Sequence, residues 1–167
     1  METTKNKIPE YNIVFFEKLK NYLNTKLYFF GSVQRPDYFP SKSDIDVLIF
    51  TDNMKSTLFK MQYFLNETPE SFHKVVWKQK INDTIIKGYK IQYKEPENNL
   101  NIEFSIFNEK NKDIVLKDRT SKTNLPFYII WLLLIIKFLF YELNILPKDW
   151  YVSCKKFIIK KDDYIIL

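Results

Sequence analysis

Two aspartates and a Gly-Ser pair form the part of the sequence whose residue types and spacing are suited to chemistry. Gly31 and Ser32 end a short apolar run, and eleven residues separate Ser32 from Asp44, which is followed by Asp46. Side chains alternate along a strand, so both carboxylates project to one side of a predicted strand over residues 45–50. Two carboxylates this close repel each other unless a cation neutralises them, and such oxygen ligands suit Mg²⁺ or Mn²⁺. The pattern therefore predicts a divalent metal site.

Glu103 is the candidate for a third carboxylate. In the run 100–107 apolar and polar residues alternate, and Glu103 belongs to the polar face of the predicted strand. A third acid helps to hold two ions about 4 Å apart, one activating an attacking hydroxyl and the other clamping phosphates. We therefore predict that Asp44, Asp46 and Glu103 are both the metal ligands and the catalytic residues.

The anion-binding side of the site falls on the Gly-Ser pair. Gly31, one of only two glycines in the chain, lets the backbone approach a triphosphate, and Ser32 offers a hydroxyl and an N–H group at the start of a helical turn. Arg35, one turn later, is the positive group expected nearest to the phosphates. With Ser43, which precedes the aspartates, these four are the predicted nucleotide-binding residues.

Together, Gly31-Ser32, Asp44-Ile45-Asp46 and Glu103 resemble the polymerase-beta-like nucleotidyltransferase superfamily, and most closely its minimal and viral members. That family has a hydrophobic residue, Gly-Ser, a spacer of about ten residues, Asp-hydrophobic-Asp and a later strand with a third acid. The likeness covers residues 10–118. It implies a mixed sheet flanked by helices, an NTP donor (ATP by default), two divalent ions and pyrophosphate as the leaving group. The acceptor stays open between nucleic acid, protein and small molecule.

Two departures from that pattern and two alternatives bear on the function. Pro36 limits the helix after the Gly-Ser pair to about one turn, and the third acid is a glutamate where aspartate is more frequent. A glycosyltransferase also uses Asp-x-Asp, but it generally needs a larger nucleotide domain than this chain supplies. A non-catalytic module of the same fold would bind nucleotide, nucleic acid or a protein partner, at a membrane or in solution. We favour the enzyme, because binding alone does not require all three acids.

The elements that must position these residues follow from hydrophobic periodicity. Apolar residues at helical intervals predict helices over 11–25 and 54–65. Short apolar or alternating runs predict strands over 27–30, 45–50, 74–79, 84–94 and 100–107, with a loop over 36–43. This order predicts an α+β fold with a mixed β-sheet flanked by helices.

A very hydrophobic segment follows the predicted sheet. From Phe127 to Leu146 the chain is apolar on all sides for three turns before Lys137, and its length is close to the roughly 20 residues of a membrane span. We predict one continuous helix over about 126–146. A helix with no polar face is either buried or in lipid, so we expect a membrane helix, a core helix or a helix buried in a homo-oligomer.

Length, charge and cysteine content bound the remaining properties. The 167 residues suffice for a nucleotidyltransferase domain over 1–122, with the hydrophobic helix and a basic tail over 123–167. The formal charge of +6 favours the approach of anionic partners. Cys154 is the only cysteine, so an internal disulfide is impossible and we expect an intracellular, cytoplasmic location, membrane-associated if the helix is an anchor.

Overall fold

The centre of the molecule is a mixed β-sheet. The computed structural model describes residues 1–78, 85–159 and 165–166. In these residues the sheet has six strands in the order β1-β2-β5-β4-β3-β6. Their bounds are Leu27–Phe30 (β1), Ile45–Thr51 (β2), His73–Lys78 (β3), Ile85–Glu95 (β4), Leu100–Asn108 (β5) and Ile165–Ile166 (β6). β2 and β5 are parallel and the other neighbouring pairs are antiparallel, which confirms the predicted mixed sheet.

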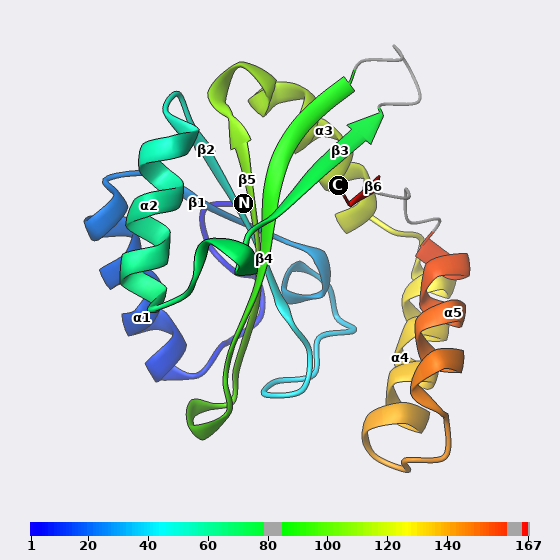
Figure 1. Cartoon of the computed structure of the whole chain (residues 1–167). Coiled ribbons are helices and arrows are strands. Elements are labelled where there is room, and N and C mark those ends of the chain that lie inside the picture. The colour runs from blue at the N-terminus through cyan, green and yellow to red at the C-terminus, as the bar shows by residue number, and fades with distance from the viewer. Residues whose placement is uncertain (79–84, 160–164, 167) are drawn as a thin grey trace.

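Helices cover both faces of this sheet. The helices are Glu10–Leu23 (α1), Met54–Leu65 (α2), Lys112–Thr123 (α3), Phe127–Tyr141 (α4) and Lys148–Ile159 (α5). α1 and α2 lie on one side of the sheet, and α3 with the pair α4–α5 lies on the other (Figure 1). Beneath α1 and α2 the core contains the alternate apolar residues of β5, and beneath α3 it contains Trp77, Phe107 and Val115. The predicted α+β fold is therefore confirmed.

Local sequence signals explain where the first helices begin and end. α1 ends at Leu23 because Asn24 adopts a left-handed conformation, with its N–H bonded to carbonyls of the last turn. The Asn53 side chain accepts a hydrogen bond from the Ser56 N–H and caps the start of α2. The predicted helices and strands up to residue 108 agree with the structure within two residues at their described ends. α3 and α5 were not predicted. The apolar residues of α3 are few and lie among polar ones, and those of α5 are interrupted by two adjacent lysines.

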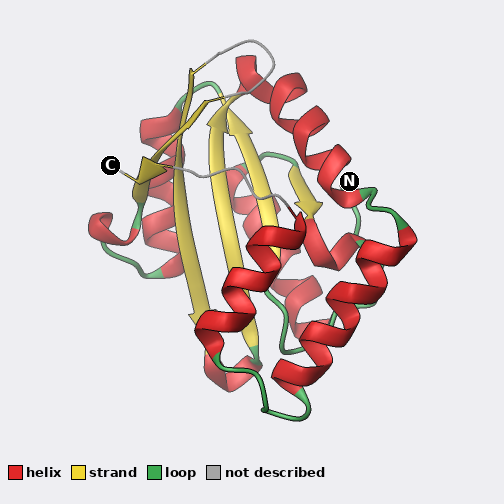
Figure 2. Cartoon of the chain, turned by 90° about the vertical axis from the view of Figure 1, so that its right-hand side faces the viewer, coloured by secondary structure: helices red, strands yellow, loops and turns green. Residues whose placement is uncertain are grey.

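The hydrophobic segment is not one helix over 126–146, and that prediction was wrong. α4 ends at Tyr141, Asn144 adopts a left-handed conformation, and α5 begins after Pro147. A residue with positive φ interrupts a right-handed helix, and the proline ring fixes the backbone for the start of the next one. The chain therefore reverses, and α5 packs along α4 through the stacked rings of Phe140 and Tyr151, whose centroids are 4.2 Å apart. Figure 2, turned so that this hairpin faces the viewer, has the two helices in front of the sheet.

α4 has apolar side chains on both its buried and its exposed side, with one charged residue, Lys137, on the buried side. Leu133 and Lys137 are 1% exposed, whereas Trp131 is 64% exposed. The exposed face of α4 consists of Phe127, Tyr128, Trp131, Leu132, Ile135 and Phe138. Within the described ranges no single helix has the length and apolar character of a membrane span. Two consecutive helical segments, Glu109–Thr123 and Phe127–Tyr141, together have the length and composition of a span, but they are bent by 76° relative to each other.

Candidate active site

The Gly-Ser pair forms a tight turn at the end of β1. Residues Gly31–Gln34 form one turn of 3-10 helix, and the Arg35 N–H donates to the Ser32 carbonyl at 2.8 Å. The chain is extended at Arg35, immediately before Pro36, which confirms that the helix after the pair is limited to about one turn. Gly31 has a φ of +70°, and a Cβ built on it would lie 1.9 Å from Oδ2 of Asp46. The backbone of the turn thus lies directly against the Asp46 carboxylate.

The three predicted acids line one pocket. Asp46 pairs with Glu103 across the parallel strands β2 and β5, so the two side chains project from the same face of the sheet next to each other. Asp44 immediately precedes β2, two residues from Asp46, and lines the same pocket. Among the residues that the structure describes, the lining includes Phe30, Gly31, Ser32, Arg35, Asp44, Asp46, Lys90, Glu103, Arg119, Lys122, Lys155 and Ile159. Residues 31–32, 44–46 and 103 of the sequence pattern are therefore brought together.

Among the described residues that line this pocket, cationic side chains outnumber the acids. The Lys90 ammonium on β4 forms an ion pair with the Glu103 carboxylate. Arg119 and Lys122 come from α3, and Lys155 comes from α5. None of these four was predicted from the sequence, because their positions depend on how α3, α5 and β4 pack. An arrangement of this kind can hold a polyanion beside the carboxylates.

Arg35 lines the pocket, but its guanidinium is engaged with Asp37. Arg35 Nε lies 2.7 Å from Asp37 Oδ1, and its Nη2 lies 3.0 Å from Oδ2. The ammonium of Lys137 on α4 lies 2.9 Å from the same Oδ2 and donates to the Asp37 carbonyl at 2.6 Å. All three side chains are buried. Phosphate binding by Arg35 stays a prediction.

The buried charges of this cluster affect each other's protonation. Burial opposes ionisation of Asp37, but the hydrogen bonds and charges of Arg35 and Lys137 outweigh it, and the pKa of Asp37 lies below its ordinary value. Burial lowers the pKa of Lys137, and the charge of Asp37 opposes that shift in part. The ionised Asp37 carboxylate therefore joins the segment after the Gly-Ser turn to α4.

Ser43 lies beside this cluster and not among the residues that line the pocket. Its hydroxyl accepts a hydrogen bond from the Phe39 N–H at 3.2 Å and lies 3.5 Å from the Lys137 ammonium. This position suits a role in shaping the loop before Asp44. Contact of Ser43 with a nucleotide stays a prediction.

The donor chemistry of the pocket fits a divalent ion such as Mg²⁺ or Mn²⁺. Asp44, Asp46 and Glu103 supply carboxylate oxygens on one face of the sheet, and the Gly31 backbone leaves no room for a side chain against Asp46. Across residues 1–78, 85–159 and 165–166, no three His, Cys, Asp or Glu side chains are close enough together to form a preassembled metal site. Because the Lys90 ammonium pairs with Glu103, an ion bound by this carboxylate would share it with the ammonium or displace the ammonium.

The size of the pocket suits phosphates better than a whole nucleotide. Its volume is about 70 Å³, below the roughly 300–1,000 Å³ of small-molecule sites. A larger cavity of about 320 Å³ lies between the N-terminal residues and α1, and its lining shares no residue with the carboxylate pocket. The chemistry-bearing residues of the sequence pattern belong to the smaller pocket.

Comparison with known proteins gives one finding. The family model described as "Nucleotidyltransferase domain" matches residues 13–141 of the chain. No curated protein and no solved structure gives a significant match to the chain.

Proposed function

Because the chain belongs to the nucleotidyltransferase domain family, we propose that it transfers a nucleoside monophosphate from an NTP to an acceptor hydroxyl. In this reaction the acceptor hydroxyl gives up its proton to solvent, its oxygen forms a bond to the α-phosphorus, and the bond between the α-phosphorus and the oxygen that bridges to the β-phosphorus breaks. Pyrophosphate leaves with that electron pair. ATP is the default donor, and the acceptor can be a nucleic acid, a protein or a small molecule.

The observation that carries this proposal is the pairing of Asp46 with Glu103 on adjacent parallel strands, with the Gly31 backbone against Asp46. Asp44, Asp46 and Glu103 would hold the divalent ions, Mg²⁺ or Mn²⁺. Bound there, such ions would activate the acceptor hydroxyl and neutralise phosphate charge.

The chain's own groups have separate roles in this proposal. Gly31 allows the backbone to approach the phosphates, and Ser32 donates a hydrogen bond to a phosphate oxygen. Lys90, Arg119 and Lys122 supply positive charge where negative charge increases on the leaving group.

The decisive test follows label from an NTP carrying ³²P at the α-phosphate, with Mg²⁺ or Mn²⁺ present. We expect the wild type to transfer the label and release pyrophosphate, and Asp46→Asn to do neither, because it removes a ligand charge with little change of shape. Asp52→Asn is the matched control, since Asp52 is exposed at the end of β2 and outside the pocket. The proposal fails if Asp46→Asn turns over as fast as Asp52→Asn.

A second candidate function is a non-catalytic module that binds nucleotide, nucleic acid or a protein partner. One observation favours it: the ion pair with Lys90 supplies Glu103 with a counter-ion from the chain itself. Such a module would bind NTP without transferring label under either metal. Equilibrium binding of each NTP, measured beside the transfer assay, separates the two functions.

A further inference from the structure

Lys155 reaches the carboxylate pocket from the last described helix. It lies on α5 and lines the pocket together with Asp44, Asp46 and Glu103. It also lies outside residues 13–141, the part of the chain that the family model matches. The family match therefore assigns no role to this lysine.

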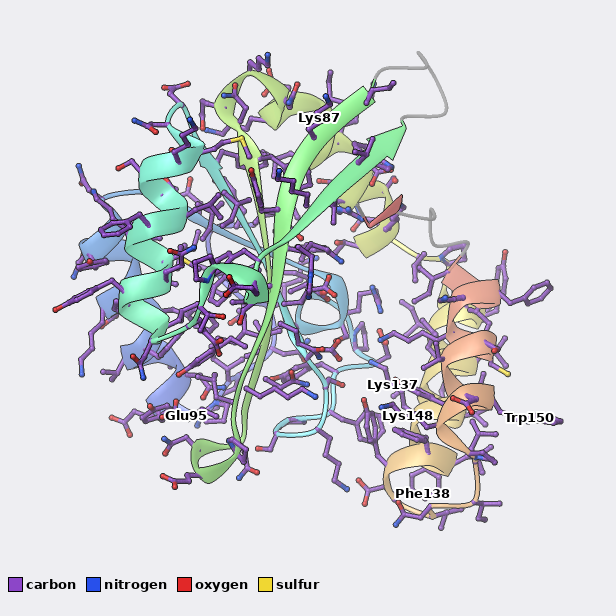
Figure 3. The ribbon with its side chains drawn as sticks, in the orientation of Figure 1. Lys87, Glu95, Lys137, Phe138, Lys148 and Trp150 are labelled. Carbon is purple, nitrogen blue, oxygen red and sulfur yellow. The ribbon has the colours of Figure 1, made fainter. Side chains whose placement is uncertain are left out.

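Two contacts hold α5 where Lys155 can enter the pocket. α4 is fixed to the segment after the Gly-Ser turn by the buried pair of Lys137 with Asp37, and α5 is fixed to α4 by the stacked rings of Phe140 and Tyr151. In Figure 3 Lys137 lies on the side of the hairpin that faces the rest of the chain, whereas Trp150 points away from it. The Lys155 ammonium also lies 5.8 Å from the centre of the Tyr151 ring, one turn earlier on α5. The packing of α5 on α4 and the contact with the Tyr151 ring thus direct the Lys155 side chain into the pocket.

Lys155 and the lysine that follows it differ in their surroundings. Lys155 is half-buried and lines the pocket together with Asp44 and Asp46. Lys156, the next residue, is less enclosed and does not line the pocket. Of these two neighbouring lysines, one is therefore a cation inside the pocket and the other is a cation outside it.

We propose that Lys155 is a substrate-binding residue that contacts the triphosphate of the NTP and the pyrophosphate formed from it. This inference rests on the proposed function, because it assigns a polyphosphate to the carboxylate pocket. A phosphate oxygen gives the ammonium an anionic partner in the pocket that Asp44 and Asp46 already line. A positive charge fixed there stabilises the negative charge that develops on the leaving group.

The test measures binding of inorganic tripolyphosphate in the presence of Mg²⁺ to the full chain, by calorimetry. Lys155→Met removes the charge and keeps the length of the side chain, and we expect it to raise the Kd roughly 10- to 100-fold, as expected for loss of a hydrogen bond to a charged group. Lys155→Arg should restore much of the affinity. Lys156→Met changes the net charge equally and should leave the Kd within about twofold of wild type, because a charge in contact with solvent is screened.

Two results would overturn the role of Lys155 in binding polyphosphate. If Lys155 serves only as a counter-ion for Asp44 and Asp46, Lys155→Met will bind Mg²⁺ more tightly and tripolyphosphate as well as wild type does, and the proposal is overturned. A wild type that does not bind tripolyphosphate overturns it as well. If Lys155→Met unfolds at a lower temperature than wild type, the comparison of Lys155→Arg with wild type decides the point.

These outcomes are separable from those of the transfer assay. A wild type that binds tripolyphosphate through Lys155 but transfers no label supports this inference and refutes the proposed reaction. A wild type that transfers label, with Lys155→Met binding tripolyphosphate normally, supports the reaction and refutes the role of Lys155.

Discussion

At the residue scale, the carboxylate pocket depends on two small details of the chain after β1. Gly31 has a positive φ and leaves space for the Asp46 carboxylate, so it sets the distance between the turn and the acids. Asp37 forms ion pairs with both Arg35 and Lys137, so it fixes the segment after the turn to α4. Substitutions at these positions therefore have different expected effects.

Gly31→Ala should reduce catalysis far more than stability. The new Cβ would meet Asp46 Oδ2 at 1.9 Å, so the carboxylate must move, and a left-handed alanine costs about 1–2 kcal/mol. We expect label transfer to be lost while urea unfolding stays cooperative. The neighbouring variant Ser32→Ala creates no clash and should weaken NTP binding by about 1 kcal/mol. Wild-type turnover by Gly31→Ala would show that Asp46 is not needed where the structure has it.

Asp37 should make folding sensitive to acid. Its pKa is lower in the folded chain than the ordinary value of 3.8, so its contribution to stability is fully present at neutral pH. That contribution is lost as the pH falls below about 3.8 and through the folded-state pKa. We expect the free energy of unfolding in urea to decrease over this range in wild type. Asp37→Asn should be less stable at neutral pH, because it leaves two buried cations without their carboxylate, and should depend less on acid pH. Parallel pH profiles for the two proteins would contradict this account.

At the element scale, α4 illustrates how an apolar helix can be buried on one side only. Its inner face packs Leu133 and Lys137 against the rest of the chain, and the packing of α5 leaves an outer stripe uncovered. The first three turns of the helix, apolar on all sides before Lys137, indicated burial all round or contact with lipid. The buried ion pair with Asp37 accounts for the lysine that interrupts this composition.

Leu133→Ala and Ile135→Ala form a matched pair on α4 that tests this division. Leu133 is 1% exposed, and its truncation should cost about 2–5 kcal/mol, the range for a buried leucine. Ile135 is 51% exposed, and its truncation should cost less than about 1 kcal/mol. Urea unfolding of both variants gives the comparison. Equal losses would mean that α4 is not seated with Leu133 inward.

At the scale of the whole molecule, the basic chain has a pocket with three carboxylates on one face of its sheet and an apolar stripe on the hairpin beside it. The pocket receives residues from β2, β4, β5, α3 and α5, so its lining depends on how the hairpin packs on the sheet. An intracellular location, contact with lipid or a second copy through residues 127–146, and the division of the chain at residue 122 stay predictions.

The outer stripe of α4 should mediate association of the full-length chain. Contiguous exposed apolar side chains mark interaction surfaces, and this stripe includes Trp131 and Ile135. We expect the wild type to form oligomers in light scattering or to float with lipid vesicles, and the double variant Trp131→Ser/Ile135→Ser to do neither. Tyr63→Ser, at an exposed aromatic position on α2, is the control. A wild type that is monomeric without detergent and does not bind vesicles would contradict the prediction.

The sequence by itself determined the elements whose signals are local. The apolar run over 45–50 and the alternation over 100–107 defined the strands that carry Asp46 and Glu103, and Gly31 and Pro36 defined the turn before them. These signals lie within a few residues of the feature that they specify. The strand phase, the pattern of acids and the resemblance to a nucleotidyltransferase therefore follow from the order of the residues alone.

Only the tertiary structure decided which residues far apart in the sequence contact one another. The burial of Lys137 depends on Asp37, a hundred residues earlier in the chain. The entry of Lys155 into the pocket depends on the reversal after Tyr141, and the pairing of Lys90 with Glu103 depends on which strand lies beside β5. Periodicity reports which face of an element is apolar, but it carries no information on the partner that covers that face. For the buried face of α4 that partner includes Asp37, whose carboxylate holds the ammonium of Lys137 in the interior of the protein.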